Sequence, residues 1–397
     1  MKPLELPILG QTPRQPPTGW PPLRLAFRPF YLLAALAAAV LMPLWWAVFT
    51  GRLVPASGLP GVLWHGHEML FGFVAAVVIG FVFTAGKTWT GLQTPRGGQL
   101  AFLALLWLSA RVAALLAPYS VFFLLDVSLL PLCAALFADL LLRVRNLRNL
   151  PVAGVLGLLA VVNLAFHLGA SGTLPIDPAW ALRAGLAVLV LLETLIAGRV
   201  VPFFTRNVTP GLQNTVPAWR EKLLGVVTAL ALAAWLAELR LAVPLLAAAA
   251  LLHAWRLHSW RPGVTLTRPI LWSLHLAYAW LPAGFALLAL ALARGESVSP
   301  ALHAFGVGAT AGLIVAMMTR TARGHTGRPL QAGRAETAAY ALVALAALLR
   351  VGAPLLLPAA YGPALLVAGT CFAAAFCIYL LRYAGWLMSP RVDGQDG

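Results

Sequence analysis

Long apolar runs follow one another along almost the whole chain, separated by short stretches that contain Pro, Gly and Arg. About twelve of them are roughly 17–25 residues long, the length that an α-helix needs to cross a bilayer. They lie near residues 27–50, 67–87, 99–117, 119–142, 151–170, 179–202, 218–238, 241–257, 269–293, 299–319, 335–357 and 361–387. Because backbone polar groups must be satisfied within each segment, we predict an all-α bundle of about twelve transmembrane helices. The run at 241–257 is short, so eleven or thirteen spans remain open.

The composition excludes a water-soluble domain. The 397 residues are 61% hydrophobic and only 10% charged, whereas roughly 25% of the residues of a soluble protein are charged. The main partner of the chain is therefore the lipid bilayer. The net charge of +16 would suit a nucleic-acid-binding protein, but the charges alternate with apolar runs instead of forming one basic patch, which excludes nucleic acid.

The three cysteines, Cys133, Cys371 and Cys377, lie in apolar runs, and neither C-x-x-C nor C-x-x-C-H occurs. We therefore expect no disulfide framework and no covalently attached c-type haem. Residues 1–26 are rich in Pro and lack the apolar core and cleavage site of a signal peptide. They are expected to form a cytoplasmic tail.

Basic residues predict which loops face the cytoplasm. Most Lys and Arg lie in the tails and the even-numbered loops, which hold Lys87, Arg96, Arg143, Arg145, Arg148, Arg206, Arg220, Lys222, Arg256, Arg261, Arg268, Arg320, Arg323, Arg328 and Arg334. The odd-numbered loops and adjoining helix ends hold only Arg52, Arg183, Arg240, Arg294 and Arg350. By the positive-inside rule, both termini are predicted to be cytoplasmic. We expect one transmembrane domain over residues 27–390 and a second cytoplasmic tail over 391–397.

An internal repeat relates the second predicted helix to the tenth. A shift of 236 residues aligns His67 with His303, Gly72 with Gly308 and Lys87 with Arg323. Both helices carry small residues every four positions, at 72, 76 and 80 and at 308, 312 and 316. Because such faces let helix backbones approach closely in lipid, we expect them to help bring the two helix ends together.

A weaker third copy begins at Arg148, but its helix near 179–202 lacks both the histidine and the small residues. With this copy, the domain would consist of four-helix units at 27–147, 148–265 and 266–390. Two related units remain the alternative. Repeats of this kind also occur in secondary transporters.

Imidazoles and a carboxylate gather at the predicted outer face. His65, His67 and Glu68 begin the second helix, His303 begins the tenth, and His167 lies near the outer end of the fifth. Imidazole binds copper, iron and zinc and is a usual axial ligand of haem. We predict that His65, His67, Glu68 and His303 hold metal, with Glu68 orienting an imidazole. Helical residues two apart point to nearly opposite sides, so His65 and His67 either share one ion from an extended segment or serve two centres.

A second set of candidates lies toward the predicted inner face. The segment after the tenth helix contains Arg320, Arg323, His325 and Arg328, which could cradle an anion or haem propionates. A positive-inside loop explains the same arginines. His275 lies about 10 Å into the ninth helix at 1.5 Å per residue, an unusual depth for a histidine. It is a candidate haem ligand, and hydrogen bonding to a neighbouring helix is the alternative.

Other ionisable residues also lie in apolar segments. Arg111, Glu193 and Arg199 must be paired or face a cavity. Asp139 and Arg143 are four residues apart and are predicted to form a helical ion pair. His253 and His258, near tryptophans, are interpreted as part of an interfacial belt without a site role.

Four segments together resemble the NnrS family. They are F-R-P-F-Y at 27–31, W-H-G-H-E-M-L-F-G-F at 64–73, P-F-F-T-R-N at 202–207 and H-A-F-G-V-G-A-T-A-G-L-I-V-A-M-M-T-R-T-A-R-G-H-T-G-R-P-L at 303–330. The resemblance implies a twelve-helix protein of the bacterial inner membrane that contains non-covalent haem b and copper. It also implies a role in nitric oxide metabolism and in resistance to nitrosative stress. Matching the segments residue by residue adds Arg206 to the candidates above.

Three functions follow as hypotheses. The first is a haem- and copper-binding protein that responds to or protects from nitric oxide, its small-molecule ligand. The second is a secondary transporter, suggested by twelve helices and a repeat. The third is an oxidoreductase that reduces NO or O₂, which would need its ligands clustered around one binuclear site. The sequence does not decide whether the protein is an enzyme, nor does it identify an electron donor.

Overall fold

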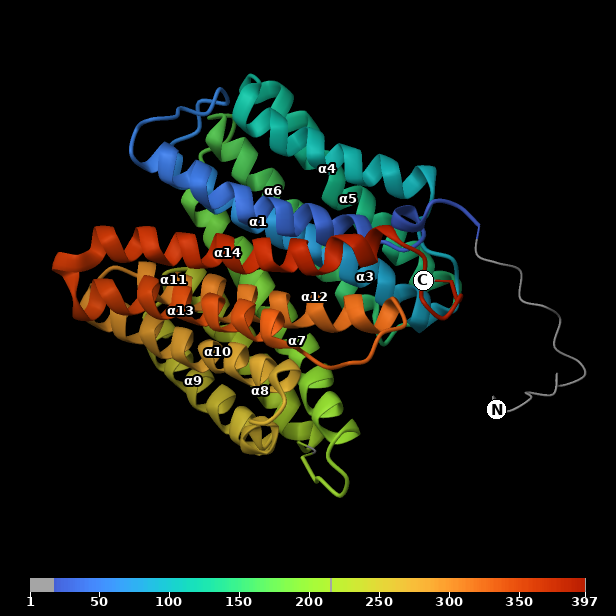
Figure 1. Cartoon of the computed structure of the whole chain (residues 1–397). Helices are drawn as coiled ribbons and strands as arrows, with labels where there is room; N and C mark the ends of the chain where they lie inside the picture. The colour runs from blue at the N-terminus through green and yellow to red at the C-terminus, as the bar shows by residue number, and fades with distance from the viewer. Residues whose placement is uncertain (1–17, 215, 397) are drawn as a thin grey trace, which may run out of the picture.

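A computed structural model describes residues 18–396 except residue 215, so the first 17 residues of the predicted N-terminal tail lie outside the described part. The described residues form helices and loops, without a strand (Figure 1). The α-helices are α1 (Phe27–Phe49), α2 (Gly61–His67), α3 (Ala75–Thr90), α4 (Gly98–Leu116), α5 (Tyr119–Arg143), α6 (Leu150–Ala170), α7 (Pro178–Asn207), α8 (Ala218–Leu236), α9 (Ala242–Ser259), α10 (Pro269–Arg294), α11 (Ser299–His303), α12 (Gly312–His325), α13 (Arg334–Leu356) and α14 (Tyr361–Met388). π-Helical segments η2 (Glu68–Val74) and η4 (Ala304–Ala311) join α2 to α3 and α11 to α12, and short 3-10 turns are η1 (Pro21–Leu23), η3 (Pro262–Thr265) and η5 (Pro358–Ala360).

The polytopic helical bundle predicted from the apolar runs is confirmed. Within the described residues, ten helices are long and apolar enough to cross a membrane. The other two expected segments are also helical, as α8 and α9, but are less apolar. In α8 the reason is local, because Arg220, Glu221 and Lys222 fall within its first five residues.

Three helices form the interior of the bundle. They are the continuous helix Gly61–Thr90, which contains η2, then α7, and the continuous helix Ser299–His325, which contains η4. In their most apolar windows 78%, 61% and 67% of the residues are buried, against 44% or less in the other seven candidate spans. Each is the second helix of one of the three predicted four-helix units, although the limits of those units remain a prediction.

The two π-helical segments follow the predicted repeat. A shift of 236 residues carries the start of η2 at Glu68 onto the start of η4 at Ala304. Each π segment follows directly on a histidine, His67 in one helix and His303 in the other. The interior helix α7 contains no such segment. π-Helical turns are rare and occur mainly at functional sites, so they draw attention to these two helix ends.

The small-residue faces have other partners than those expected. A Cβ at Gly80 would meet Tyr31 and Phe30 of α1 at 3.0–3.1 Å, so this face packs against α1. A Cβ at Gly312 would meet Ala277 of α10 at 2.8 Å. The prediction that these faces bring the second and tenth helices together is therefore wrong. Gly80, Gly308 and Gly312 instead pack against the first helix of their own predicted unit, and Gly72 packs against Arg111 of α4.

Both ends of the described chain meet at one face of the bundle. The buried Arg28, at the start of α1, donates from Nη1 to the carbonyl oxygens of Leu387 at 2.8 Å and Ser389 at 2.7 Å. These carbonyls lie at the C-terminal end of α14, where a cation is favourable for the helix dipole. In Figure 1 the blue start of α1 and the red end of α14 lie side by side.

Candidate metal centre

Three helices bring two imidazoles and a carboxylate together. His67 ends α2, Asp126 lies in α5, and His167 lies near the end of α6. Both imidazoles are fully buried and Asp126 is only 4% exposed. One nitrogen of each histidine and one oxygen of Asp126 lie within 4.8 Å of one another, and this group is the only one of its kind among the described residues.

One oxygen of Asp126 is the meeting point of these side chains. Oδ2 lies 3.2 Å from Nε2 of His67 and 3.1 Å from Nε2 of His167. Asn163, one helical turn before His167, donates to the same oxygen at 2.6 Å. The side-chain oxygen of Asn163 lies 3.0 Å from Nε2 of His67. Both Nε2 atoms therefore face the same point between α2, α5 and α6.

The second nitrogen of each imidazole also has a partner. Nδ1 of His67 lies 3.1 Å from Oε1 of Glu68, and Nδ1 of His167 lies 3.0 Å from the hydroxyl oxygen of Tyr119. Partners of this kind fix the tautomer and the ring orientation of metal-binding histidines. The structure thus places Glu68 where it can orient His67 while the Nε2 atom stays available to a metal.

Arg111 of α4 compensates part of the negative charge. Its Nη1 donates to Oε1 of Glu68 at 2.9 Å, and its other terminal nitrogen is paired with Oδ1 of Asp126. With neutral imidazoles, two carboxylates and one guanidinium leave one negative charge in a buried site. A bound cation would offset that charge, because an uncompensated buried charge is costly.

Aromatic rings enclose the centre. Phe166 and Phe122 lie 4.7 and 5.2 Å from the His67 ring, between ring centroids. Phe123 stacks on the His167 ring at 5.1 Å. These rings keep water away from the imidazoles and hold them in place, as a preorganised metal site requires.

The donor set fits a metal ion of the copper or zinc type. Imidazole nitrogen suits both metals, and tetrahedral bonds of 2.0–2.1 Å would separate two donor atoms by about 3.4 Å. The separations of 3.1 and 3.2 Å at Asp126 need only a small expansion. Oδ1 of Asp126 can keep its pairing with Arg111 while Oδ2 turns to a metal.

The other predicted metal ligands lie elsewhere. His65 is stacked on Trp45, with ring centroids 4.4 Å apart, and faces away from His67. It lies near His303, whose Nδ1 donates to the carbonyl oxygen of Ser299 at 2.8 Å, and the charge of Arg350 acts on both imidazoles. Of the two arrangements predicted for His65 and His67, the structure therefore has them in two separate places.

The arginines predicted to bind an anion or propionates are dispersed. Arg323 uses its donors on Glu336 at 2.5 Å, Tyr383 at 3.1 Å and the carbonyl of Pro329 at 3.1 Å. Arg328 lies over the Trp386 ring at 4.2 Å. The hydrogen-bond donors of Arg323 are therefore used by other groups of the protein, which agrees with the alternative of a positive-inside loop.

The remaining candidates lie on either side of that loop. His325 lies beside the Phe27 ring, 5.5 Å away. Arg320 lies over the Phe204 ring at 3.6 Å, and Arg206 is exposed near the end of α7. These two arginines thus flank the end of α7, whereas His325 faces α1.

His275 is buried in the first turns of α10. Its Nε2 lies 3.1 Å from the hydroxyl oxygen of Thr205, next to Phe204 in α7. Its Nδ1 is buried without a hydrogen-bond partner among the described residues. A buried imidazole with one unused nitrogen fits a haem ligand, and the hydrogen bond to Thr205 of a neighbouring helix fits the structural alternative.

The charged residues in apolar segments are paired or face a cavity, as predicted. Arg111 pairs with Glu68 and Asp126, and Arg199 donates to the side chain of Asn149 at 3.1 Å. Glu193 lines a cavity. The ion pair predicted between Asp139 and Arg143 is confirmed at 2.7 Å.

The interpretation of His253 as an interfacial residue is wrong. Its side chain is fully buried, 3.0 Å from the hydroxyl of Thr228 and 2.6 Å from that of Tyr278. Helix α9 packs against α8 and α10 at this point, so nearby tryptophans did not mark a membrane interface here.

Sequence reasoning did not single out Asp126, Asn163 or Tyr119. Asp126 is a carboxylate seven residues into an apolar run, a signal for function that is visible in the sequence. Asn163 and His167 are four residues apart, so they share a helix face. Which helix faces them depends on packing, and the sequence alone carried no sign of it.

One family matches nearly the whole chain. The family described as NnrS protein matches residues 21–391, which include all the segments quoted for the resemblance. No curated protein matches the chain. Together with the helical bundle and its ten apolar spans, this match shows that the chain is a multi-pass membrane protein and a member of the NnrS family.

Proposed function

We propose that the protein binds copper and haem b in the bacterial inner membrane and takes part in the response to nitric oxide. The observation that carries the copper assignment is the convergence of His67, Asp126 and His167. Their donor atoms, their oriented imidazoles and the net negative charge of the site support a cation. Glu68 and Tyr119 orient the two imidazoles, and Arg111 holds the carboxylates in place.

The His65–His303 pair is less suited to a second copper ion. It includes no carboxylate, and the guanidinium of Arg350 would repel an added cation. We therefore assign copper to the buried centre. His65 and His303 stay candidates for a different group, such as a haem whose propionates Arg350 would pair with.

For haem we propose His275 as the iron ligand, with Arg320 and Arg206 near the propionates. The unused Nδ1 of His275 supports this assignment. A bound ferrous haem would bind NO, and copper would supply one-electron chemistry. His275 lies in a helix that begins at the predicted inner face, and His67 starts a helix at the predicted outer face. One binuclear site built from both is therefore not supported.

Metal analysis and visible absorption of the purified protein test this function. We expect stoichiometric copper and a Soret band. His67→Ala and His167→Ala should lose copper and keep the Soret band, whereas His275→Ala should lose the Soret band and keep copper. His258→Ala, at an exposed histidine of α9, is the matched control and should keep both.

A colourless protein without metal would contradict the proposal. It would favour secondary transport, which the three interior helices and the intramembrane Glu193 would then explain. Loss of the Soret band in His303→Ala, with retention in His275→Ala, would instead assign haem to the His65–His303 pair.

A further inference from the structure

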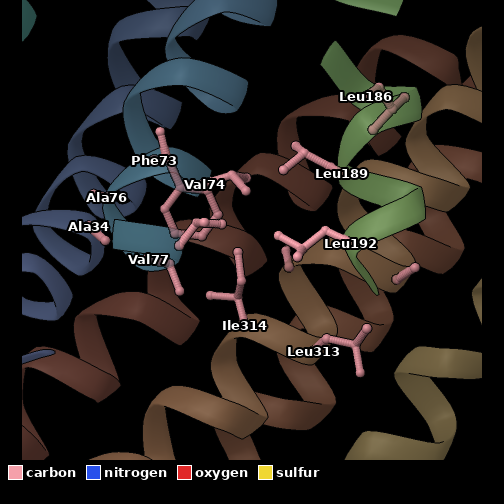
Figure 2. Close-up of a cluster of buried hydrophobic side chains, with 14 of the residues drawn as sticks. Ala34, Phe73, Val74, Ala76, Val77, Leu186, Leu189, Leu192, Leu313 and Ile314 are labelled. Carbon is pink, nitrogen blue, oxygen red and sulfur yellow. The ribbon is translucent and has the colours of Figure 1, made fainter. Parts of the chain in front are cut away.

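A cavity of about 100 Å³ lies between the three interior helices. Its walls are mostly apolar and include Val74, Val77, Leu189, Leu192, Leu313 and Ile314. Figure 2 shows Val74 and Val77 facing Leu189 and Leu192, with Leu313 and Ile314 at one end of the space between them. Mostly apolar walls with a few polar side chains are typical of small-molecule sites.

Three polar side chains from three different helices also line this cavity. Glu193 comes from α7, Thr310 from η4 and Tyr31 from α1. Oε2 of Glu193, Oγ1 of Thr310 and the hydroxyl of Tyr31 are buried and have no hydrogen-bond partner of good geometry among the described residues. A buried polar atom without a well-formed hydrogen bond costs about 1–3 kcal/mol. Glu193 lies beside Thr310 and Tyr31 lies beside Thr321, so these groups satisfy one another in part, and a ligand would supply the remaining partners.

Of these three side chains, the carboxyl group of Glu193 is the one that most needs polar partners. It lies near the middle of α7, and no ion pair to it occurs within the described part of the chain. A carboxyl group among apolar side chains needs a counter-charge or hydrogen-bond donors. The walls carry no cation. The hydroxyl of Thr310 beside Glu193 offers one donor, and a donating group of a ligand would supply another.

The walls also suit an aromatic ring. Phe81 and Met317 line the cavity with Tyr31, and aromatic rings and thioethers make favourable contacts with a ring. No histidine lines the cavity, so a haem iron there would have no imidazole ligand. The ligand indicated is thus apolar and lipid-soluble, with an aromatic head that donates hydrogen bonds.

We propose that this cavity binds a membrane hydroquinone, with Glu193 accepting a hydrogen bond from one of its hydroxyl groups. Thr310, next to Glu193, adds a second polar contact, and Tyr31 provides a separate one. The apolar walls cover the ring. This site is distinct from the proposed copper centre and does not depend on a bound metal.

Direct binding of radiolabelled decylubiquinol to purified protein in detergent tests the site. Two unlabelled compounds serve as competitors for binding to the wild-type protein. Decylubiquinone lacks the hydroxyl donors, and decylbenzene lacks all polar groups. Both should compete at least about tenfold more weakly than unlabelled decylubiquinol, because the hydrogen bond to a carboxylate is missing. Equal competition by decylbenzene would overturn the proposal in favour of a merely apolar cavity.

Variants locate the site. Glu193→Leu should weaken decylubiquinol binding at least about tenfold, whereas Glu193→Gln keeps an acceptor oxygen and should retain most of it. Leu189→Trp fills the cavity and should abolish binding. Glu296→Leu and Leu251→Trp, at exposed positions, are the matched controls and should bind like the wild type.

Unchanged binding in Leu189→Trp or in Glu193→Leu would overturn the proposal. A second result would also overturn it: the wild type binds no hydroquinone, and Leu189→Trp loses the Soret band. Haem would then occupy the cavity. Copper content, measured on the same samples, reports separately on the proposed function. Elution as a single species and an unchanged helix content by circular dichroism establish that each variant is folded.

Discussion

His65 and His67 are two residues apart on one helix, and each contacts a different part of the bundle. His67 faces Asp126 and His167, and His65 stacks on Trp45. A helix places residues two apart on nearly opposite sides, so a single ion cannot use both without unwinding. The π-helical segment begins after His67, so the two histidines stay within a regular helical turn.

Arg111 is the residue whose loss should destabilise the centre most. Arg111→Met leaves two buried carboxylates without their cation, and breaking a buried pair in this way costs about 3–5 kcal/mol. Chemical denaturation of the metal-free protein in detergent should show this loss. Arg143→Met, which breaks the exposed pair with Asp139, should cost only about 0–1 kcal/mol. Equal effects of the two variants would contradict the pairing described here.

Substitution of Tyr119 tests whether a hydrogen bond to Nδ1 holds the imidazole of the copper centre in its orientation. Tyr119→Phe removes the partner of Nδ1 of His167 and should weaken copper binding by about 10–100-fold. Tyr340→Phe removes a buried hydroxyl without a hydrogen-bond partner and should leave copper affinity unchanged. Copper affinity is measured by competition with a chelator. An unaltered affinity in Tyr119→Phe would exclude its orienting role.

At the scale of elements, the apolar runs predicted nine of the twelve long helices within about two residues of their bounds. The three interior helices each extend five or six residues beyond one end of the predicted run, because polar residues and His or Arg continue the helix there. The π-helical segments could not be predicted, because they depend on how the helix packs. In η4, Gly308 lies against Trp280 of α10, and in η2, Gly72 lies against Arg111. Gly72 and Gly308 were visible in the sequence as small residues, but their contacts with side chains of other helices were not.

Close packing at Gly308 leads to a prediction about η4. A Cβ there would lie 2.3 Å from the Trp280 ring, so Gly308→Ala forces the indole to move and should destabilise the protein by about 1–3 kcal/mol. Gly154→Ala, in α6 with no atom within 4 Å, should instead stabilise it by about 0.5–1 kcal/mol. Thermal unfolding in detergent compares the two. A stabilised Gly308→Ala would contradict the packing of η4 against α10.

At the scale of the whole molecule, the repeat explains why the sequence grouped His67 with His303 and did not group it with Asp126. His67 and His303 occupy equivalent positions in two units, whereas His67 contacts Asp126 and His167. The partners of His67 come from α5 and α6, which adjoin each other across the predicted boundary between the first and second units. Sequence comparison within the chain finds equivalent residues, whereas a metal site is formed by adjacent ones.

The copper content of two single variants tests the central claim most directly. The structure predicts that purified His167→Ala contains almost no copper, because one of the two imidazoles of the buried centre is gone. It predicts that His303→Ala keeps the copper-to-protein ratio of the wild type. Copper retained in His167→Ala and lost in His303→Ala would contradict the assignment of the metal centre to His67, Asp126 and His167.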